Sequence, residues 1–162
     1  MPDPIRLAFL GCGFITRVHS RILRSLGREF SCSYASRDVA KAEQYRREFG
    51  GARAFGDYRS AIEDPGTDAV VVAVPPRDHL PLALSALEAG KHVLVEKPAF
   101  PRLEDFHLAV AARDRAGRSV IVGENDHYKP LAVCLRRLVA EGVVGEMVFA
   151  QFTTIARRLK TG

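Results

Sequence analysis

The chain has 162 residues, of which 24 are Lys or Arg and 19 are Asp or Glu, so its formal net charge is +5. With 47% hydrophobic and 27% charged residues, the composition is that of a folded globular chain rather than a disordered one. No apolar stretch approaches the ~20 residues of a membrane-spanning helix, and the first residues lack the basic-then-apolar order of a signal peptide. These features predict a cytoplasmic protein that does not bind a membrane.

The basic residues argue against nucleic-acid binding, and the cysteines argue against disulfide-linked and metal-binding classes of protein. The arginines are scattered, with no dense basic run and no interleaved aromatic residues, so nucleic acid is not expected as a partner. The three cysteines, Cys12, Cys32 and Cys134, are odd in number and widely spaced, which excludes a disulfide framework and a CxxC metal site. Each lies in an apolar segment, so we expect three buried, inert thiols and no bound metal.

Short apolar runs alternate with amphipathic stretches over the first three quarters of the chain. The apolar runs predict strands at residues 5–10, 30–35, 52–55, 68–74, 91–95 and 119–122. The amphipathic stretches predict helices at residues 15–26, 39–49, 57–63, 78–89 and 103–116. Asp38 fits an N-cap, and Gly50 with Gly51 fits a left-handed helix end. This alternation predicts an α/β fold with a doubly wound parallel sheet.

The pattern changes at residue 123. A polar stretch containing proline occupies residues 124–130, a helix is predicted at 131–141, and residues 146–155 alternate like an antiparallel strand. One helix and one or two strands cannot bury a core of their own. We therefore expect a complete nucleotide-binding domain at residues 1–122 and the truncated start of a second domain at residues 123–162.

The first candidate site is the sequence GCGFIT, which directly follows the first predicted strand and opens the first helix. Gly11 permits a tight turn, and Gly13 lets the backbone approach a pyrophosphate that is bound by N–H groups at the helix N-terminus. The third position of the fingerprint is Thr16 rather than Gly or Ala. A simple strand–helix turn is the alternative, but the flanking strand and helix favour dinucleotide binding.

The second candidate site, Ser36 and Arg37, ends the second strand. Sites that prefer NAD place an acidic residue here to bind the ribose 2′-hydroxyl. A hydroxyl and a guanidinium suit a 2′-phosphate, which a carboxylate would repel. NADP is therefore the preferred cofactor. Asp38 keeps NAD possible, although its expected role is to cap the following helix.

Two more groups follow the strands at 68–74 and 91–95. Val74, Pro75 and His79 lie at the edge where open α/β sheets bind ligands, so they are candidates to border a nicotinamide, while a solvent-facing position in a helix is the alternative for His79. Glu96 and Lys97 follow the second strand. From there Lys97 could transfer a proton during hydride transfer, with an exposed ion pair before a turn as the simpler alternative.

Together the segments GCGFIT, ASRD, DAVVVAVPPRDH and above all AGKHVLVEKP (residues 89–98) resemble the glucose–fructose oxidoreductase / inositol dehydrogenase / rhizopine-catabolism (Gfo/Idh/MocA) family. The resemblance spans essentially the whole chain. It implies a Rossmann domain followed by an α+β domain with a mostly antiparallel sheet. It also implies oxidation or reduction of sugars, cyclitols and related hydroxy compounds with NAD(P). At full length a homo-oligomer is expected.

The resemblance also implies roles for individual positions. The pyrophosphate would be lined by Gly11, Gly13, Phe14 and Ile15. The adenosine ribose or its phosphate would be bound by Ser36 and Arg37. The nicotinamide half of the cofactor would be bordered by Val74, Pro75 and His79, with Glu96 contacting cofactor and Lys97 as the catalytic lysine. Asn125 and His127 would lie near the nicotinamide and the substrate. For His127 the alternative is a polar position in a loop.

One part of the family pattern is missing. The family's acid/base His and substrate-binding Asp form a DxxxH-type pair in the second domain, and the sequence ends before any such position. Two hypotheses therefore stay open. The chain is either the N-terminal portion of an NAD(P)-dependent oxidoreductase or a non-catalytic NAD(P)-binding module. An S-adenosylmethionine site ranks last, because Ser36 and Arg37 stand where such a site needs an acidic residue.

Overall fold

The computed structural model describes residues 3–153. The chain divides into two compact units, Met1–Glu124 and Asn125–Gly162, and the division falls two residues after the predicted first domain. The assignment of residues 123–162 to a second domain remains a prediction.

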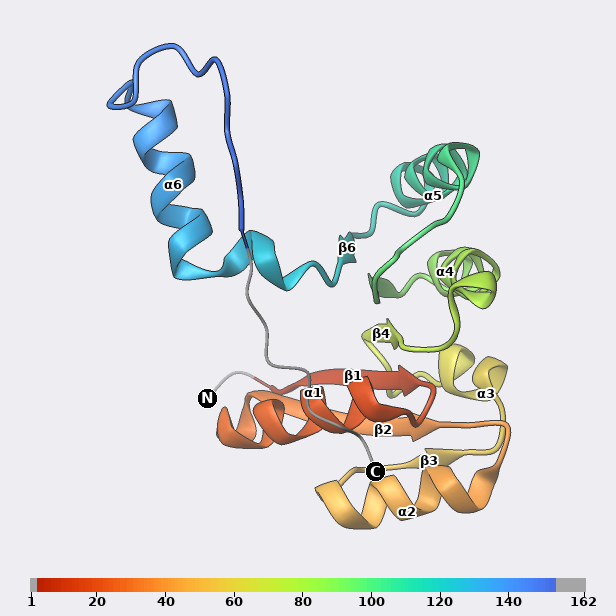
Figure 1. Ribbon diagram of the computed structural model, residues 1–162. Coiled ribbons are helices and arrows are strands. Elements are labelled where there is room, and N and C mark those ends of the chain that lie inside the picture. The colour runs from red at the N-terminus through yellow and green to blue at the C-terminus, as the bar shows by residue number, and fades with distance from the viewer. Residues whose placement is uncertain (1–2, 154–162) are drawn as a thin grey trace. The chain divides into compact units, whose positions relative to one another are not determined.

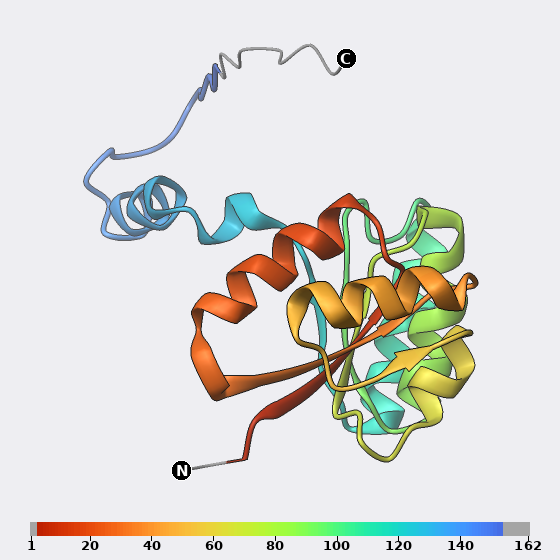
Figure 2. The same cartoon turned by 90° about the horizontal axis from the view of Figure 1, so that it is seen from below.

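The first unit is built on a six-stranded sheet in which all strands run parallel (Figures 1 and 2). The strands are β1 (Ile5–Leu10), β2 (Phe30–Ala35), β3 (Ala54–Phe55), β4 (Ala69–Val72), β5 (His92–Val95) and β6 (Val120–Val122). Their order is β3-β2-β1-β4-β5-β6. The order reverses between β1 and β4, which is where open sheets of this kind bind ligands. The predicted Rossmann sheet is thus confirmed.

Helices lie on both faces of this sheet. One face carries α1 (Phe14–Ser25) and α2 (Val39–Phe49), and the other carries α3 (Tyr58–Glu63), α4 (His79–Glu88) and α5 (Leu103–Ala116), as Figure 2 shows. Two 3₁₀ turns, Gly27–Glu29 and Pro76–Asp78, complete the unit. Asp38 caps α2 through hydrogen bonds from two backbone N–H groups, and Gly50 ends the helix in the left-handed conformation, as predicted.

Side-chain alternation along the central strands divides the core into two clusters. On β1, Ala8 and Leu10 pack in the cluster that includes side chains of α3, α4 and α5. Phe9 lies in the other cluster, with Tyr34 and the α2 side chain Phe49. Both faces of β1 are therefore buried, as expected for a central parallel strand. The apolar runs predicted the strands correctly because such a strand needs hydrophobic side chains on both sides.

The second unit contains a 3₁₀ turn, Asn125–Tyr128, and the helix α6 (Pro130–Ala140). The strand predicted at residues 146–155 is wrong over its described part, because residues 146–153 form no strand; residues 154–155 lie outside the described part of the chain. A strand needs a neighbour to pair its backbone N–H and C=O groups, and no described residue of this unit provides one. The apolar side chains Val148, Phe149 and Phe152 are at least 81% exposed.

The cysteines differ from one another in burial. Cys12 is buried and Cys32 half-buried, and burial raises the pKa of each thiol to about 11, so both are held as unreactive thiols. Cys134 is exposed, which contradicts the predicted burial. It lies on α6, which has no buried residue, because its apolar pattern has little to pack against within its own unit.

Candidate functional site

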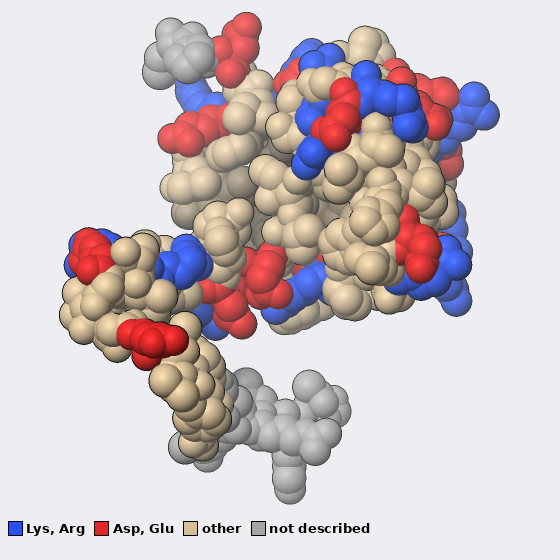
Figure 3. Space-filling view, turned by 90° about the horizontal axis from the view of Figure 1, so that it is seen from above, with Lys and Arg blue, Asp and Glu red and all other residues tan. Residues whose placement is uncertain are grey.

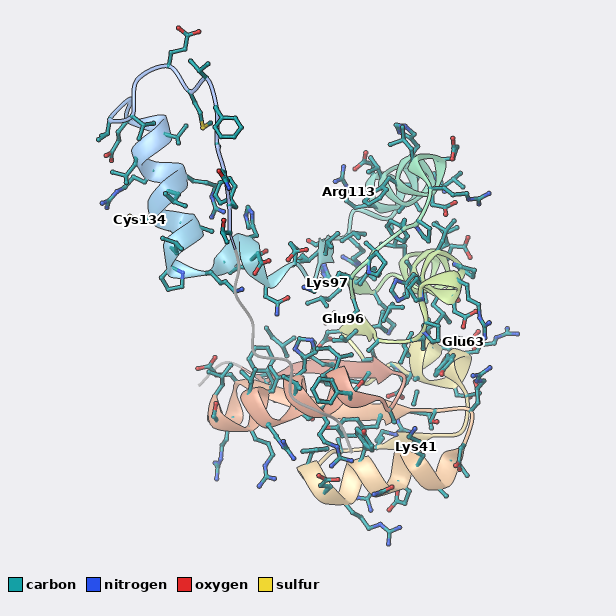
Figure 4. The ribbon with its side chains drawn as sticks, viewed as in Figure 1. Lys41, Glu63, Glu96, Lys97, Arg113 and Cys134 are labelled. Carbon is teal, nitrogen blue, oxygen red and sulfur yellow. The ribbon has the colours of Figure 1, made fainter. Side chains whose placement is uncertain are left out.

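The predicted site residues of the first unit follow strand ends that share one edge of the sheet. Gly11 follows β1, Ser36 follows β2, Val74 lies just beyond β4 and Glu96 directly follows β5. Because the strands are parallel, their carboxyl ends meet at this edge. Figure 4 labels Glu96 and Lys97 where β5 ends.

Gly11 makes a turn that only glycine fits. Its φ is +106°, and a Cβ atom at this position would lie 2.5 Å from the carbonyl oxygen of Ala73. Its N–H donates to the carbonyl oxygen of Ala35 at 2.9 Å. The hydroxyl of Thr16, which is fully buried, donates to the Gly11 carbonyl oxygen at 2.7 Å. Thr16 therefore closes the turn through its side chain, which explains why the third fingerprint position need not be Gly or Ala.

Gly13 is the N-cap of α1 and differs from Gly11. Its φ is −105°, and a Cβ atom there would meet nothing within 4 Å. No side chain of residues 3–153 caps α1, and its first turn holds no acidic residue. The first N–H groups of a helix have no partner within the helix, so this end has open space, free donors and a positive dipole. Phe14 at the first helical position is 81% exposed. These features fit a pyrophosphate.

Tyr45 is a site residue that the sequence analysis missed. It lies on α2, is 4% exposed, and donates its hydroxyl hydrogen to the carbonyl oxygen of Gly13 at 3.0 Å. The Arg17 guanidinium lies 4.9 Å from the centre of its ring. The sequence placed Tyr45 only within the helix predicted at residues 39–49, because nothing in the sequence indicated that the tip of its side chain reaches another loop.

The turn after β2 separates the roles of its three polar residues. The hydroxyl of Ser36 accepts from the N–H of Asp38 at 3.2 Å. The carboxylate of Asp38 accepts from the first N–H groups of α2, so it is used as a helix cap. Arg37 is exposed. Burial raises the pKa of the Tyr58 hydroxyl on α3, and the positive charge of Arg37 opposes this rise.

His79 connects two loops at this edge. It is 1% exposed, so the solvent-facing alternative is wrong. Its Nδ1 lies 2.9 Å from the carbonyl oxygen of Ala99, and its Nε2 lies 2.8 Å from that of Val74. A neutral imidazole has one N–H to donate and an imidazolium has two. Val74 is half-buried and Pro75 exposed. Since both ring nitrogens contact backbone carbonyl oxygens, His79 holds the two loops in position. Its nearness to nicotinamide remains a prediction.

Glu96 and Lys97 face different partners. Glu96 is 8% exposed, its Oε1 lies 2.6 Å from Nε2 of His19 on α1, and its Oε2 accepts from the backbone N–H of Lys97 at 3.3 Å. A Cβ atom at Gly123 would lie 3.2 Å from the same Oε1. The Lys97 ammonium is exposed and lies 3.8 Å from Oε1 of Glu124. The sequence analysis missed His19. The pattern of the helix predicted at residues 15–26 did not distinguish this histidine from the surface residues beside it.

Asn125 and His127 belong to the second unit. Both are exposed in the turn Asn125–Tyr128. The ring of His127 packs edge-on against that of Tyr128, with centroids 4.9 Å apart, and its Nδ1 lies 3.4 Å from Nη1 of Arg136. Their roles near nicotinamide and substrate remain predictions.

The described part of the chain has a further hollow that lies apart from this edge. A recess of about 1110 Å³ lies at the amino ends of β1 and β2, away from the glycine turn. Within residues 3–153, no three His, Cys, Asp or Glu side chains group closely enough to hold a metal ion. Among the described helices, none has the length and apolarity to cross a membrane. On the face in Figure 3, basic and acidic side chains are interspersed.

Comparison with known proteins shows which family the chain belongs to. Residues 5–124 match the family model Gfo/Idh/MocA, described as an oxidoreductase family with an NAD-binding Rossmann fold. The chain therefore belongs to the Gfo/Idh/MocA family of NAD-binding oxidoreductases, and the resemblance seen in its motifs is confirmed.

Individual relatives point the same way. A 1,5-anhydro-D-fructose reductase from Ensifer adhaerens is 34% identical over 131 residues, which are 80% of this chain and 38% of that protein. The WlbA dehydrogenase from Bordetella pertussis, solved with NADH and UDP-GlcNAcA, superposes with a TM-score of 0.80 at 25% identity over 88% of this chain and 44% of its own.

A 3-ketoreductase from Actinomadura kijaniata, solved with NADP and TDP-benzene, superposes with a TM-score of 0.78 at 28% identity, over 89% of this chain and 44% of its own. The chain spans less than half the length of these proteins. The two solved relatives hold different nicotinamide cofactors, NADH in one and NADP in the other, so the likeness to them does not choose between the two.

Proposed function

We propose that residues 5–124 are the cofactor-binding domain of an oxidoreductase that moves a hydride between NAD(P) and a sugar, cyclitol or related hydroxy compound. The observation that carries the proposal is that the uncapped N-terminus of α1 and the exposed Lys97 lie at the same sheet edge in a chain of this family. A dinucleotide needs a donor site for its pyrophosphate and a reactive group beside its nicotinamide, and this edge carries both.

The residues at the edge suit the two ends of such a cofactor. The N–H groups of Phe14 and Ile15 would hold the pyrophosphate, since Gly13 leaves space before them. Arg37 and Ser36 would hold a 2′-phosphate, because the one acidic side chain in this turn, Asp38, is committed to capping α2. This arrangement supports NADP as the preferred cofactor.

Lys97 would handle the proton that accompanies hydride transfer. The bound nicotinamide supplies the hydride acceptor or donor. In the oxidative direction the Lys97 amine takes the proton of the substrate hydroxyl as the hydride leaves the same carbon, and in the reductive direction the ammonium returns a proton to the carbonyl oxygen. The side chain is exposed at the carboxyl edge, so it can reach a ligand bound there.

The substrate class rests on the relatives. One relative at 34% identity is named for reducing an anhydro sugar, and another at 32% identity is an inositol 2-dehydrogenase. These substrates share a ring carbon that carries a hydroxyl or carbonyl group, which is the group that Lys97 would serve. We therefore propose a polyhydroxylated ring as the substrate.

Cofactor titration tests the proposal directly. The fluorescence of NADPH and of NADH is followed as each is titrated with the 162-residue chain. We expect both to bind, NADPH more tightly, and we expect Gly13→Ala to weaken both. Failure of both cofactors to bind would refute the proposal. A preference for NADH would refute only the part that concerns the 2′-phosphate.

A further inference from the structure

We propose that His19 is a positioning residue for Lys97: it holds the Glu96 carboxylate against α1 and so keeps that carboxylate from pairing with the neighbouring Lys97 ammonium. The inference rests on the proposed function only in that Lys97 is the proton-transfer group. It concerns a contact between α1 and the end of β5 that no sequence motif of the chain indicates.

The His19–Glu96 contact is short and largely buried. The two side chains approach to 2.6 Å, and Glu96 as a whole residue is 8% exposed. An ionised carboxylate can only accept, so His19 donates through Nε2–H. A buried carboxylate that loses its hydrogen-bonding partner is strongly disfavoured, and this holds Glu96 to the contact with His19.

Aromatic neighbours fix the imidazole of His19. The His19 ring stacks on Phe9, with centroids 6.3 Å apart and an interplanar angle of 27°. Phe9 itself is fully buried on β1 and stacks on Tyr34 with centroids 5.6 Å apart. Buried neighbours therefore restrain the ring plane of His19, and with it the direction from which Nε2 meets Glu96.

The engagement of Glu96 by His19 affects Lys97. With Oε1 engaged by His19, the other oxygen of Glu96 accepts from the Lys97 backbone N–H. The Lys97 ammonium then lies 3.8 Å from Glu124 and stays exposed. Without His19, the Lys97 ammonium, one residue away in the chain, would pair with the buried Glu96 carboxylate. Such an ion pair would stabilise the protonated form of Lys97 and withdraw it from the sheet edge.

The test measures the reactivity of single lysine amines. The 162-residue chain, without cofactor, is treated with trace acetic anhydride at mildly alkaline pH, and acetylation is quantified by mass spectrometry. The exposed Lys41 on α2 is the internal reference. His19→Leu should slow acetylation of Lys97 relative to Lys41 roughly threefold, the size expected for one partly exposed ion pair. His19→Gln, which keeps an N–H donor at similar reach, should react like the wild type.

A double-mutant cycle separates positioning from general loosening of the fold. Glu96→Gln removes the charge that would capture Lys97, so in that background His19→Leu should leave Lys97 reactivity unchanged. His107→Leu, at an exposed histidine on α5, is the matched control and should also have no effect. The proposal fails if His19→Leu leaves Lys97 reactivity unaltered, or if the decrease persists in the Glu96→Gln background. Because cofactor is absent, neither outcome depends on whether NAD(P) binds.

Discussion

The Tyr45 hydroxyl on α2 donates a hydrogen bond to the carbonyl oxygen of Gly13, 3.0 Å away and 32 residues earlier in the chain. This bond joins the second helix to the loop that would bind the pyrophosphate. Because the carbonyl of the N-cap is held from outside, the first N–H groups of α1 have a fixed direction.

Tyr45→Phe removes this bond and leaves the ring in the core. We expect a loss of about 1 kcal/mol in the free energy of unfolding, the usual net value of one such hydrogen bond. We also expect weaker NADPH binding, since the loop becomes less restrained. Urea unfolding and the fluorescence titration measure the two effects. Unchanged cofactor affinity would show that the bond serves stability alone.

The two glycines of the first loop should respond differently to alanine. Gly11→Ala forces a side chain into a position with φ +106° and 2.5 Å from the Ala73 carbonyl oxygen, so we expect about 2–3 kcal/mol of destabilisation. Gly13→Ala meets no protein atom within 4 Å. It should fold normally yet bind NADPH roughly tenfold more weakly, because its methyl group occupies the space before the donors. Equal stability of the two variants would contradict this assignment.

Arg37→Ala should change cofactor preference without changing stability. Its side chain is exposed, so little packing is lost. Losing a charged hydrogen bond to a 2′-phosphate should weaken NADPH binding roughly tenfold to a hundredfold and leave NADH binding nearly unchanged. Arg47→Ala, at an exposed arginine farther along α2, is the control and should alter neither affinity. An equal loss for both cofactors would mean that Arg37 contacts a part that they share.

Lys97→Ala tests the proposed chemistry in the enzyme that contains this domain. Turnover of the sugar or cyclitol substrate should fall a hundredfold or more, since general acid–base groups contribute about 10²–10⁴-fold. NADPH affinity should stay close to that of the wild type. Activity within about tenfold of the wild type, a barrier change of about 1.4 kcal/mol, would refute the assignment of Lys97 as the proton-transfer group.

The ion pair of Arg6 and Asp68 predicts how stability depends on pH. A hydrogen bond from the Arg6 guanidinium lowers the pKa of Asp68 to about 2 in the folded state, against about 3.9 in an unfolded chain. The pair therefore contributes fully above pH ~4, and its contribution is lost as the pH falls toward 2. The difference in urea midpoint between wild type and Asp68→Asn should shrink over this range. Asp114→Asn is the control, because Asp114 is exposed and pairs with its neighbour Arg113. Its urea midpoint should differ less from that of the wild type than the midpoint of Asp68→Asn does.

Much of the first unit could be predicted because its signals are local. The strand at 30–35 and the helices at 39–49 and 103–116 have the predicted bounds, since hydrophobic period, caps and glycine stops act over a few residues. The strand predicted at 146–155 was wrong over its described residues because an alternating pattern needs a partner strand to become a sheet. An alternating apolar pattern therefore does not by itself produce a strand where the described residues provide no partner strand.

The sequence by itself determined the order of elements, the glycine turn at the start of α1 and the place of Lys97 at the end of a strand. Each depends on residues adjacent in the chain. Only the tertiary structure decided which distant groups meet there: the buried ring of His79 between two loops, Tyr45 on Gly13, and His19 on Glu96, 77 residues away. Such contacts are set by the packing of helices on the sheet, and the spacing of residue types along a chain does not encode them pair by pair.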